Sequence, residues 1–188
     1  MYHVSNDKRS QKSAQLIWEG MEKALQEKTL RKLRVTDIYG KSFVSRATFY
    51  RLFDSVEDVL SYECDLIYCQ LAEVVQNAAF DSKQQLFLYL IEKWLEQEVL
   101  IKTLVENNLV SVIYETHMKN RELMKDVFLK DAVITDAEAD YLSAVLATLI
   151  PASVNVWYLH GKEESPKEIY QAMSQSLSIV AHELLPNE

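Results

Sequence analysis

The stretch that decides the fold is VTDIYGKSFVSRATFYRLFDSVEDVL, residues 35–60. Its first part carries apolar or aromatic side chains at helical spacing, at Val35, Ile38 and Tyr39. A short break follows, and Ser45 then stands where the N-cap of a second helix is expected. The stretch therefore predicts two short helices joined by a tight turn, which is the helix-turn-helix arrangement.

The second predicted helix, residues 46–53, has two kinds of side chain. Phe49 and Phe53 are expected to face the core, whereas the outward side chains are those of Arg46, Ala47, Thr48, Tyr50 and Arg51. Arginine forks can bond to guanine, hydroxyls can hold phosphate oxygens, and a methyl group can contact thymine. This face therefore predicts a surface that reads the major groove of DNA.

The run S-R-A-T-F-Y-R-L-F, preceded by V-T-D-I and followed by S-V-E-D-V-L, resembles the DNA-binding domain of the TetR/AcrR family of bacterial repressors. The resemblance covers about residues 9–60. It implies an all-α chain with two parts: a three-helix DNA-binding head at residues 1–54 and a helical ligand-binding and dimerisation body at residues 55–188. It also implies that Thr36, early in the first helix of the motif, and Ser45 belong to the DNA-binding surface.

Three positions carry a residue other than the usual one in that family. Phe43 occupies the turn where glycine is usual, Arg34 stands at a capping threonine position, and Val56 replaces a lysine that commonly touches phosphate. These positions keep a second interpretation open, in which the protein is a co-regulator of TetR type that acts through a protein partner, with weak or no DNA binding.

The charge of the chain is distributed unevenly. Residues 1–53 carry 11 basic and 5 acidic side chains, a net charge of +6, whereas the remainder carries 9 basic and 23 acidic side chains, a net charge of −14. A basic head on an acidic body is typical of a protein of which one end approaches the phosphate backbone.

The composition favours an all-α fold, because only 3 glycines and 3 prolines occur in 188 residues. Helical patterns cover about residues 8–28, 35–42, 46–53, 56–78, 83–97, 99–118 with a break at 107–108, 122–130, 136–161 and 167–185. The two cysteines, Cys64 and Cys69, would point to different faces of one helix, so a reduced, cytoplasmic protein is expected. The N-terminus has no apolar signal core.

Residues 141–161 contain no Asp, Glu, Lys or Arg. A membrane span is the alternative considered, but interrupting polar side chains favour a helix buried in the core and in a subunit interface. A second apolar stripe follows at Ile169, Met173, Leu177, Val180 and Leu184. We predict that these two helices form a two-fold, four-helix interface, so the protein is expected to be a homodimer without membrane association.

The body offers aromatic side chains but only 9 basic residues. A small-molecule effector is therefore predicted to be neutral, apolar or cationic, and to lie near Trp94, Tyr114 and His117. The chain has no recognisable catalytic cluster, metal-ligand spacing or phosphate loop, so no enzyme activity, metal or cofactor is expected. A helical-bundle enzyme would need a convergent titratable cluster, and a purely structural helical protein would not need Arg46, Tyr50 and Arg51 exposed together.

Taken with the resemblance, these features predict a ligand-responsive transcription regulator. Its partner would be a double-stranded DNA operator. The regulator is expected to act as a repressor, which a small molecule releases from that operator. The mechanism implied is a two-state equilibrium in which the ligand changes the separation of the two heads.

Overall fold

A computed structural model describes residues 1–129 and 133–184, and these residues form an all-α fold, as the sequence predicts. The helices are α1 (Lys8–Leu25), α2 (Val35–Ser42), α3 (Arg46–Leu52), α4 (Val56–Asn77), α5 (Lys83–Leu95), α6 (Glu98–Glu106), α7 (Ser111–Lys119), α8 (Arg121–Met124), α9 (Asp136–Leu159) and α10 (Pro166–Leu184). A 3₁₀ turn at Leu30–Lys32 and a π-helical segment at Lys125–Leu129 complete the described secondary structure. Within these residues, the only strand-type pairing is one isolated bridge between Tyr2 and Phe53.

Helix starts are fixed by capping side chains, among them that of Ser45, which the sequence predicts. The side chains of Ser45, Ser55, Ser82 and Thr135 each accept a hydrogen bond from a backbone N–H in the first turn of α3, α4, α5 and α9. The first helix is shorter than predicted, because the carbonyl of Ala24 accepts from the N–H groups of both Glu27 and Lys28 and closes the helix at Leu25. The predicted ends at residues 130 and 185 lie outside the described residues.

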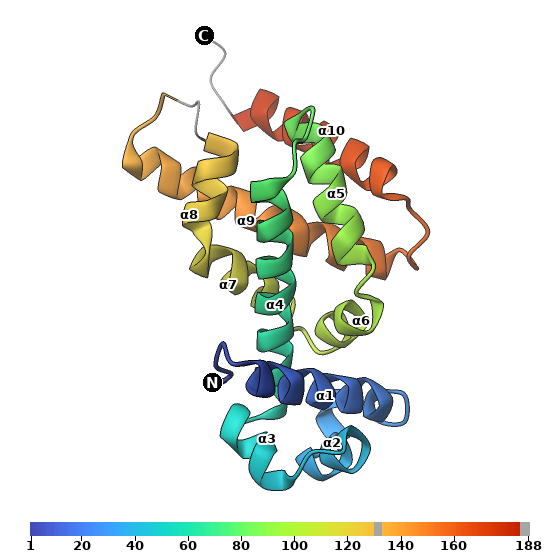
Figure 1. The fold of residues 1–188 in the computed structure, drawn as a ribbon. Coiled ribbons are helices and arrows are strands. Elements are labelled where there is room, and N and C mark those ends of the chain that lie inside the picture. The colour runs from blue at the N-terminus through green and yellow to red at the C-terminus, as the bar shows by residue number, and fades with distance from the viewer. Residues whose placement is uncertain (130–132, 185–188) are drawn as a thin grey trace.

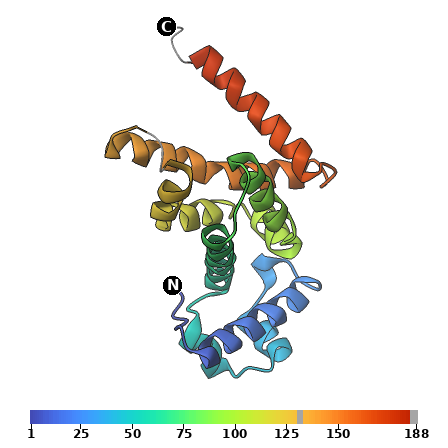
Figure 2. The same ribbon diagram turned by 45° about the horizontal axis from the view of Figure 1, so that its top comes forward.

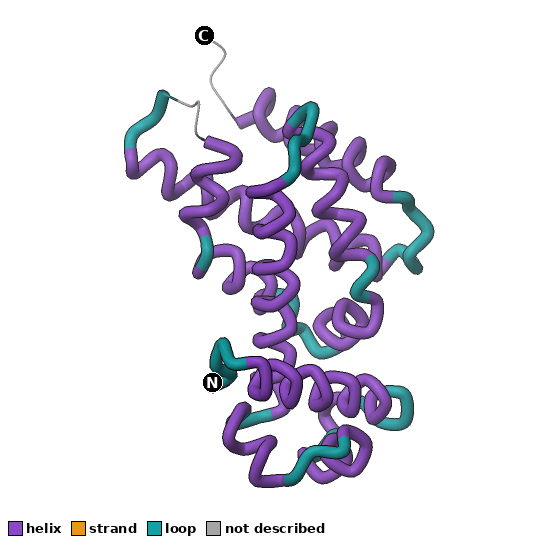
Figure 3. The backbone as a smooth tube through the Cα atoms, viewed as in Figure 1, coloured by secondary structure: helices purple, strands orange, loops and turns teal. Residues whose placement is uncertain are grey.

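The head helices α1, α2 and α3 gather at one end of the molecule, and α4 runs from them through the middle of the body (Figure 1). The helices α5, α7 and α9 surround the far part of α4, whereas α6 lies between the body and α1 (Figure 1). Short loops join most of these helices, as the tube drawing makes clear (Figure 3). The long helix α4 is therefore the covalent connection along which a change in the body can reach the head.

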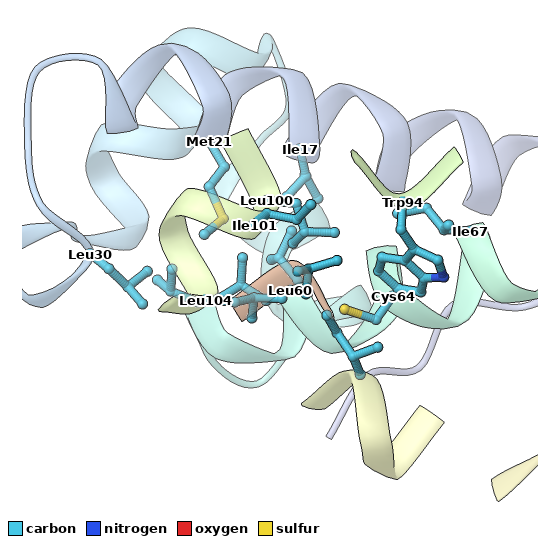
Figure 4. Close-up of a cluster of buried hydrophobic side chains, with 14 of the residues drawn as sticks. Ile17, Met21, Leu30, Leu60, Cys64, Ile67, Trp94, Leu100, Ile101 and Leu104 are labelled. Carbon is cyan, nitrogen blue, oxygen red and sulfur yellow. The ribbon is translucent and has the colours of Figure 1, made fainter. Parts of the chain in front are cut away.

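One apolar core runs through both parts of the chain. Ile17 and Met21 of α1 belong to the same cluster as Leu100, Ile101 and Leu104 of α6, together with α4 side chains such as Leu60 (Figure 4). All of these side chains are almost completely buried. The head therefore has a substantial apolar contact with the body beyond the covalent link through α4.

Helix α9 has the length and mean hydropathy, 1.6, that a membrane-spanning helix would have. In the structure, however, one side of it is part of the body, because Ala147, Ile150 and Val154 are buried. Other apolar side chains of α9 remain outside: Tyr141 is 79% exposed and Leu159 is 68% exposed. One copy of the chain thus buries one side of α9, and burial of its other side in a subunit interface stays a prediction.

Helix α10 is packed only in its first half. Ile169 is buried, Met173 is half-buried, and Tyr170 stacks edge-on against Phe87 of α5 at 6.1 Å between ring centroids. From Ser174 onward every described side chain is exposed, and this half projects from the body (Figure 2). The predicted stripe therefore divides: Leu177 and Val180 are free of the body, whereas the side chain of Leu184 lies outside what the structure describes.

Candidate nucleic-acid interface and internal cavity

The helix-turn-helix is held by its apolar side. Phe49 and Leu52 of α3 are buried in the head core, and the Ser45 hydroxyl accepts a hydrogen bond from the Thr48 N–H at 3.1 Å. The cap and the two buried side chains fix the rotation of α3 about its axis. The opposite face of α3 is consequently turned to solvent.

Most of the predicted DNA-binding residues lie on that solvent face. Ser45, Arg46, Ala47, Tyr50 and Arg51 are exposed, and Thr36 is exposed in the first turn of α2. Thr48 differs from these, because it is half-buried and its hydroxyl hydrogen-bonds to that of Ser45 at 2.9 Å. Thr48 thus contributes to the cap as well as to the surface.

The two arginines of α3 have different neighbours. The Arg46 guanidinium lies over the Tyr50 ring, 5.5 Å from its centroid. Arg51 lies near Asp7, the N-cap of α1, whose pKa is lowered first by the Ser5 hydroxyl, then by backbone N–H groups, and to a smaller extent by Arg51. Neither arginine is in an ion pair within the described part of the chain. Their hydrogen-bond donors are therefore available to an anionic partner.

The three departures from the family pattern have distinct structural consequences. Phe43 adopts a left-handed backbone with φ of 57° and is 91% exposed, so an apolar ring protrudes from the turn. At the start of α2, the Asp37 carboxylate accepts from the Arg34 N–H at 2.9 Å, as in one half of a capping box, and the Asp37 N–H donates to the Arg34 carbonyl at 2.8 Å. Val56 is buried at the start of α4, so a packing side chain stands where the family usually has a phosphate contact.

A cavity of about 70 Å³, partly open to solvent, lies in the body beside the far half of α4. Its wall contains no charged side chain: it is formed by Tyr68, Leu71, Ala72, Val75, Phe87, Leu90, Trp94, His117, Leu123, Met124, Val127, Phe128, Leu146, Leu149 and Ile150. Two of the three predicted effector-binding residues, Trp94 and His117, meet here with ring centroids 6.0 Å apart. Tyr114 is half-buried on α7 and is not among the lining residues.

His117 is the titratable group of this wall. Desolvation lowers its pKa to about 4, against a smaller opposite effect of hydrogen bonding to the backbone of Ala147. The imidazole is therefore neutral at pH 7. Its Nδ1 atom is buried without a hydrogen-bond partner.

Most residues of the cavity wall could not be predicted from the sequence. The lining residues come from four stretches of the chain, at 68–75, 87–94, 117–128 and 146–150, and a single apolar position on a helix does not indicate the space that it borders. One signal was available: Pro151 lies inside the uncharged run and removes a helical hydrogen bond close to the cavity.

No cluster of His, Cys, Asp and Glu that could hold a metal ion occurs in residues 1–129 and 133–184. Cys64 is buried with its thiol pKa raised by desolvation, and Cys69 is exposed; both are free thiols. Neither geometry activates a sulfur nucleophile.

No protein-family model matches this sequence, and no curated protein matches it at significant similarity. Three solved structures are similar to it in fold. Lin0861 from Listeria innocua is 13% identical with a TM-score of 0.78, over 95% of this chain and 96% of that one. A TetR transcriptional regulator from Streptococcus agalactiae 2603V is 20% identical with a TM-score of 0.55, over 87% and 93%. The dihydroxyacetone kinase operon activator DhaS is 18% identical with a TM-score of 0.58, over 89% and 94%. The chain therefore has the all-helical fold of TetR-type regulators.

Proposed function

We propose that this protein is a DNA-binding transcription regulator of TetR type, which binds a double-stranded operator as a homodimer and is released by a small molecule, so that it acts as a repressor. The observation that carries the proposal is the exposed face of α3, where Arg46, Tyr50 and Arg51 stand together on a buried, capped helix. A purely structural helix would not need this set of donors in solvent. The regulator needs no enzyme activity or cofactor, and we place it in the cytoplasm.

The dimer is supported by apolar surface that one copy leaves uncovered. Leu159 of α9 and Ile179 of α10 are 68% and 63% exposed, and Val145, Val156, Leu177 and Val180 are exposed as well. A projecting helix of this kind is only marginally stable without a partner. A second copy would cover α9 and α10 in a four-helix, two-fold interface and would set the two heads for successive major grooves, about 34–36 Å apart.

Two structural connections run from the cavity toward the head. The first is α4 itself, which contributes Tyr68, Leu71 and Val75 to the wall and begins at Val56 against the head. The second starts on α7, two residues after His117: the Lys119 ammonium bonds to Asp65 of α4 at 2.6 Å and to the Tyr2 hydroxyl at 3.1 Å. Tyr2 in turn pairs with Phe53 at the end of the reading helix. A ligand that moves α4 relative to α7 would therefore act on the head through both.

The effector is expected to be neutral, apolar or cationic, because the body is acidic and the cavity wall has no basic side chain. It can lower the DNA affinity only by as much as it prefers the conformation that does not fit the operator.

The alternative is a co-regulator that acts through a protein partner. The exposed Phe43 ring and the buried Val56 side chain favour it, since the first is an apolar contact site on the head and the second removes a phosphate contact. One of the structurally similar proteins is named as an operon activator.

The test is selection of duplexes from a random library with the full chain, followed by footprinting of the selected sequence. The proposal expects a two-fold symmetric site with half-sites about one helical turn apart. Failure to enrich any duplex, together with capture of DNA only in the presence of a second protein, would favour the co-regulator.

A further inference from the structure

The internal cavity is apolar on every side except at one ring. Its lining residues include no Asp, Glu, Lys or Arg, and the Tyr68 hydroxyl is already engaged, because it donates to the backbone carbonyl of Asn120 at 3.1 Å. An ionised ligand would lose its hydration there without meeting an opposite charge, and the attraction of aromatic faces for a cation is too small to replace that hydration. The wall therefore narrows the effector class to neutral molecules.

The helix next to His117 explains why this histidine holds one hydrogen bond. In a regular helix, the N–H at position 151 would donate to the carbonyl of Ala147, but Pro151 has no N–H. That carbonyl is the hydrogen-bond partner of the His117 imidazole instead. A carbonyl only accepts, so it satisfies the single N–H of a neutral ring.

The other nitrogen of a neutral ring is an acceptor, and the protein offers it nothing. His117 is 5% exposed, its Nδ1 atom is buried without a partner, and no described residue donates a hydrogen bond to the ring. A water molecule would fit poorly, because it needs two or more polar partners and the surrounding wall is hydrocarbon. Because Nδ1 is itself buried, a ligand with an apolar body and one donor group would turn the ring or displace a lining side chain in order to satisfy it while filling the space.

We propose that the cavity binds a small, neutral, largely apolar molecule through one hydroxyl or N–H group, which donates to the free ring nitrogen of His117. This proposal rests on the proposed function only in taking the cavity as the effector site. The volume of about 70 Å³ sets the size of the bound part to roughly that of one small ring. His117 would then accept the hydrogen bond from the ligand's donor group, while Trp94 and Phe87 contact the apolar part of the ligand.

The test compares four probes of similar size on the full chain by isothermal titration and thermal shift: phenol, toluene, benzoate and benzylammonium. Toluene has the shape of phenol but is more apolar, so a preference for phenol can come only from the hydrogen bond. We expect phenol to bind about two- to twelvefold more tightly than toluene, the range that corresponds to the net value of a buried hydrogen bond, about 0.5–1.5 kcal/mol. The two ions should not bind.

Two variants separate the donor contact from general packing. His117→Phe keeps an aromatic ring but removes the acceptor, so toluene should then bind more tightly than phenol. His160→Phe makes the same exchange at an exposed histidine outside the wall and should keep the preference for phenol. If the His117→Phe variant does not fold, nitrogen NMR of the wild-type imidazole decides: phenol should shift a His117 ring resonance in the direction of a donated hydrogen bond, and toluene should not.

Equal or tighter binding of toluene by the wild-type protein, binding of either ion in preference to phenol, or no binding of any probe would overturn the proposal. DNA binding by the same preparation, measured in parallel, keeps this failure apart from failure of the proposed function. A preparation that binds a selected duplex but no phenol contradicts the inference about the ligand alone.

Discussion

Single residues set how closely the helices of the head approach. Gly20 lies where α1 crosses α2, and a Cβ atom placed there would stand 2.5 Å from the Ser42 Cβ and 2.8 Å from the Ile38 carbonyl oxygen. The other glycine of the head, Gly40, has open space around it. Glycine is therefore needed at position 20 for the close approach of α1 and α2, whereas a larger residue can replace it at position 40. The side chains on the outer face of α3 are exposed, and under the proposed function they contribute to DNA binding and not to packing.

Gly20→Ala is expected to destabilise the protein by about 1–3 kcal/mol, because backbone atoms of α2 cannot yield as a side chain would. Gly40→Ala is its matched control and should stabilise the protein by about 0.5–1 kcal/mol, since alanine favours a helix. Urea denaturation of the two variants measures both values. Equal effects of the two substitutions would contradict the close approach of α1 and α2.

Arg46→Ala is expected to weaken binding to a selected duplex by about 1–3 kcal/mol if the guanidinium reads a base. Arg121→Ala supplies the control, because Arg121 is an exposed arginine of the body with carboxylate neighbours Glu122 and Asp140. Fluorescence anisotropy on one labelled duplex compares them. Unchanged affinity in the Arg46 variant would remove this residue from the reading surface.

Among the elements, α4 carries the most information about the connection of head and body. It carries a buried titratable side chain, Glu63, which is 7% exposed. Desolvation raises the pKa of Glu63 from 4.5 to about 8, and the nearby carboxylate of Glu22 on α1 adds to the rise. The joint between α1 and α4 thus contains a carboxyl group that is protonated at neutral pH.

This group makes the stability of the protein fall with rising pH. Its contribution is complete below the unfolded pKa, near 4.5, and is lost as the pH passes the folded value of about 8. Glu63→Gln should therefore raise the free energy of unfolding at pH 8.5 by at least about 1 kcal/mol relative to its effect at pH 5. Glu73→Gln, at an exposed position of α4, should show no such difference. Urea titrations at both pH values measure it, and a pH-independent effect of Glu63→Gln would be the contrary result.

The elements also show how much the sequence alone can predict. Local sequence signals were enough for the start of α3: Ser45 caps this helix where predicted, because a cap is an interaction between residues three apart. The cavity could not be predicted from the sequence, because Tyr68, Trp94 and His117 come together only through the packing of α4, α5 and α7. For the same reason Tyr114 was expected in a site whose wall is formed without it. The apolar stripe of α10 could be predicted from its helical spacing, but which half of α10 the body would bury could not.

A single copy of the molecule leaves apolar surface uncovered on α9 and α10. Its projecting half-helix, residues 174–183, and the uncovered side of α9 leave apolar side chains in solvent on the part of the body away from the head (Figure 2). Exposed apolar surface of this kind is typical of an interaction site. Under the proposed function, with one reading helix per chain, a symmetric pair would double the number of DNA contacts.

Sedimentation at micromolar concentration should therefore show a species of about twice 21.8 kDa. Val180→Glu should shift it toward the monomer and weaken DNA binding with it, since a charge would be buried in the interface. Gln175→Glu, at an exposed position of α10 off the apolar stripe, should leave the dimer intact. A wild-type monomer at this concentration would contradict both the interface and the paired-head mechanism.

The central claim, that the head binds DNA, is tested most directly by the salt dependence of binding to a duplex. The wild-type chain is titrated against a labelled, selected duplex by fluorescence anisotropy over a range of salt concentrations. With basic side chains from two heads neutralising several phosphates, the affinity should fall by about a hundredfold or more between roughly 50 and 200 mM salt. No binding to any duplex at the lowest salt concentration, or an affinity that salt does not change, would contradict the claim and leave the co-regulator as the better account.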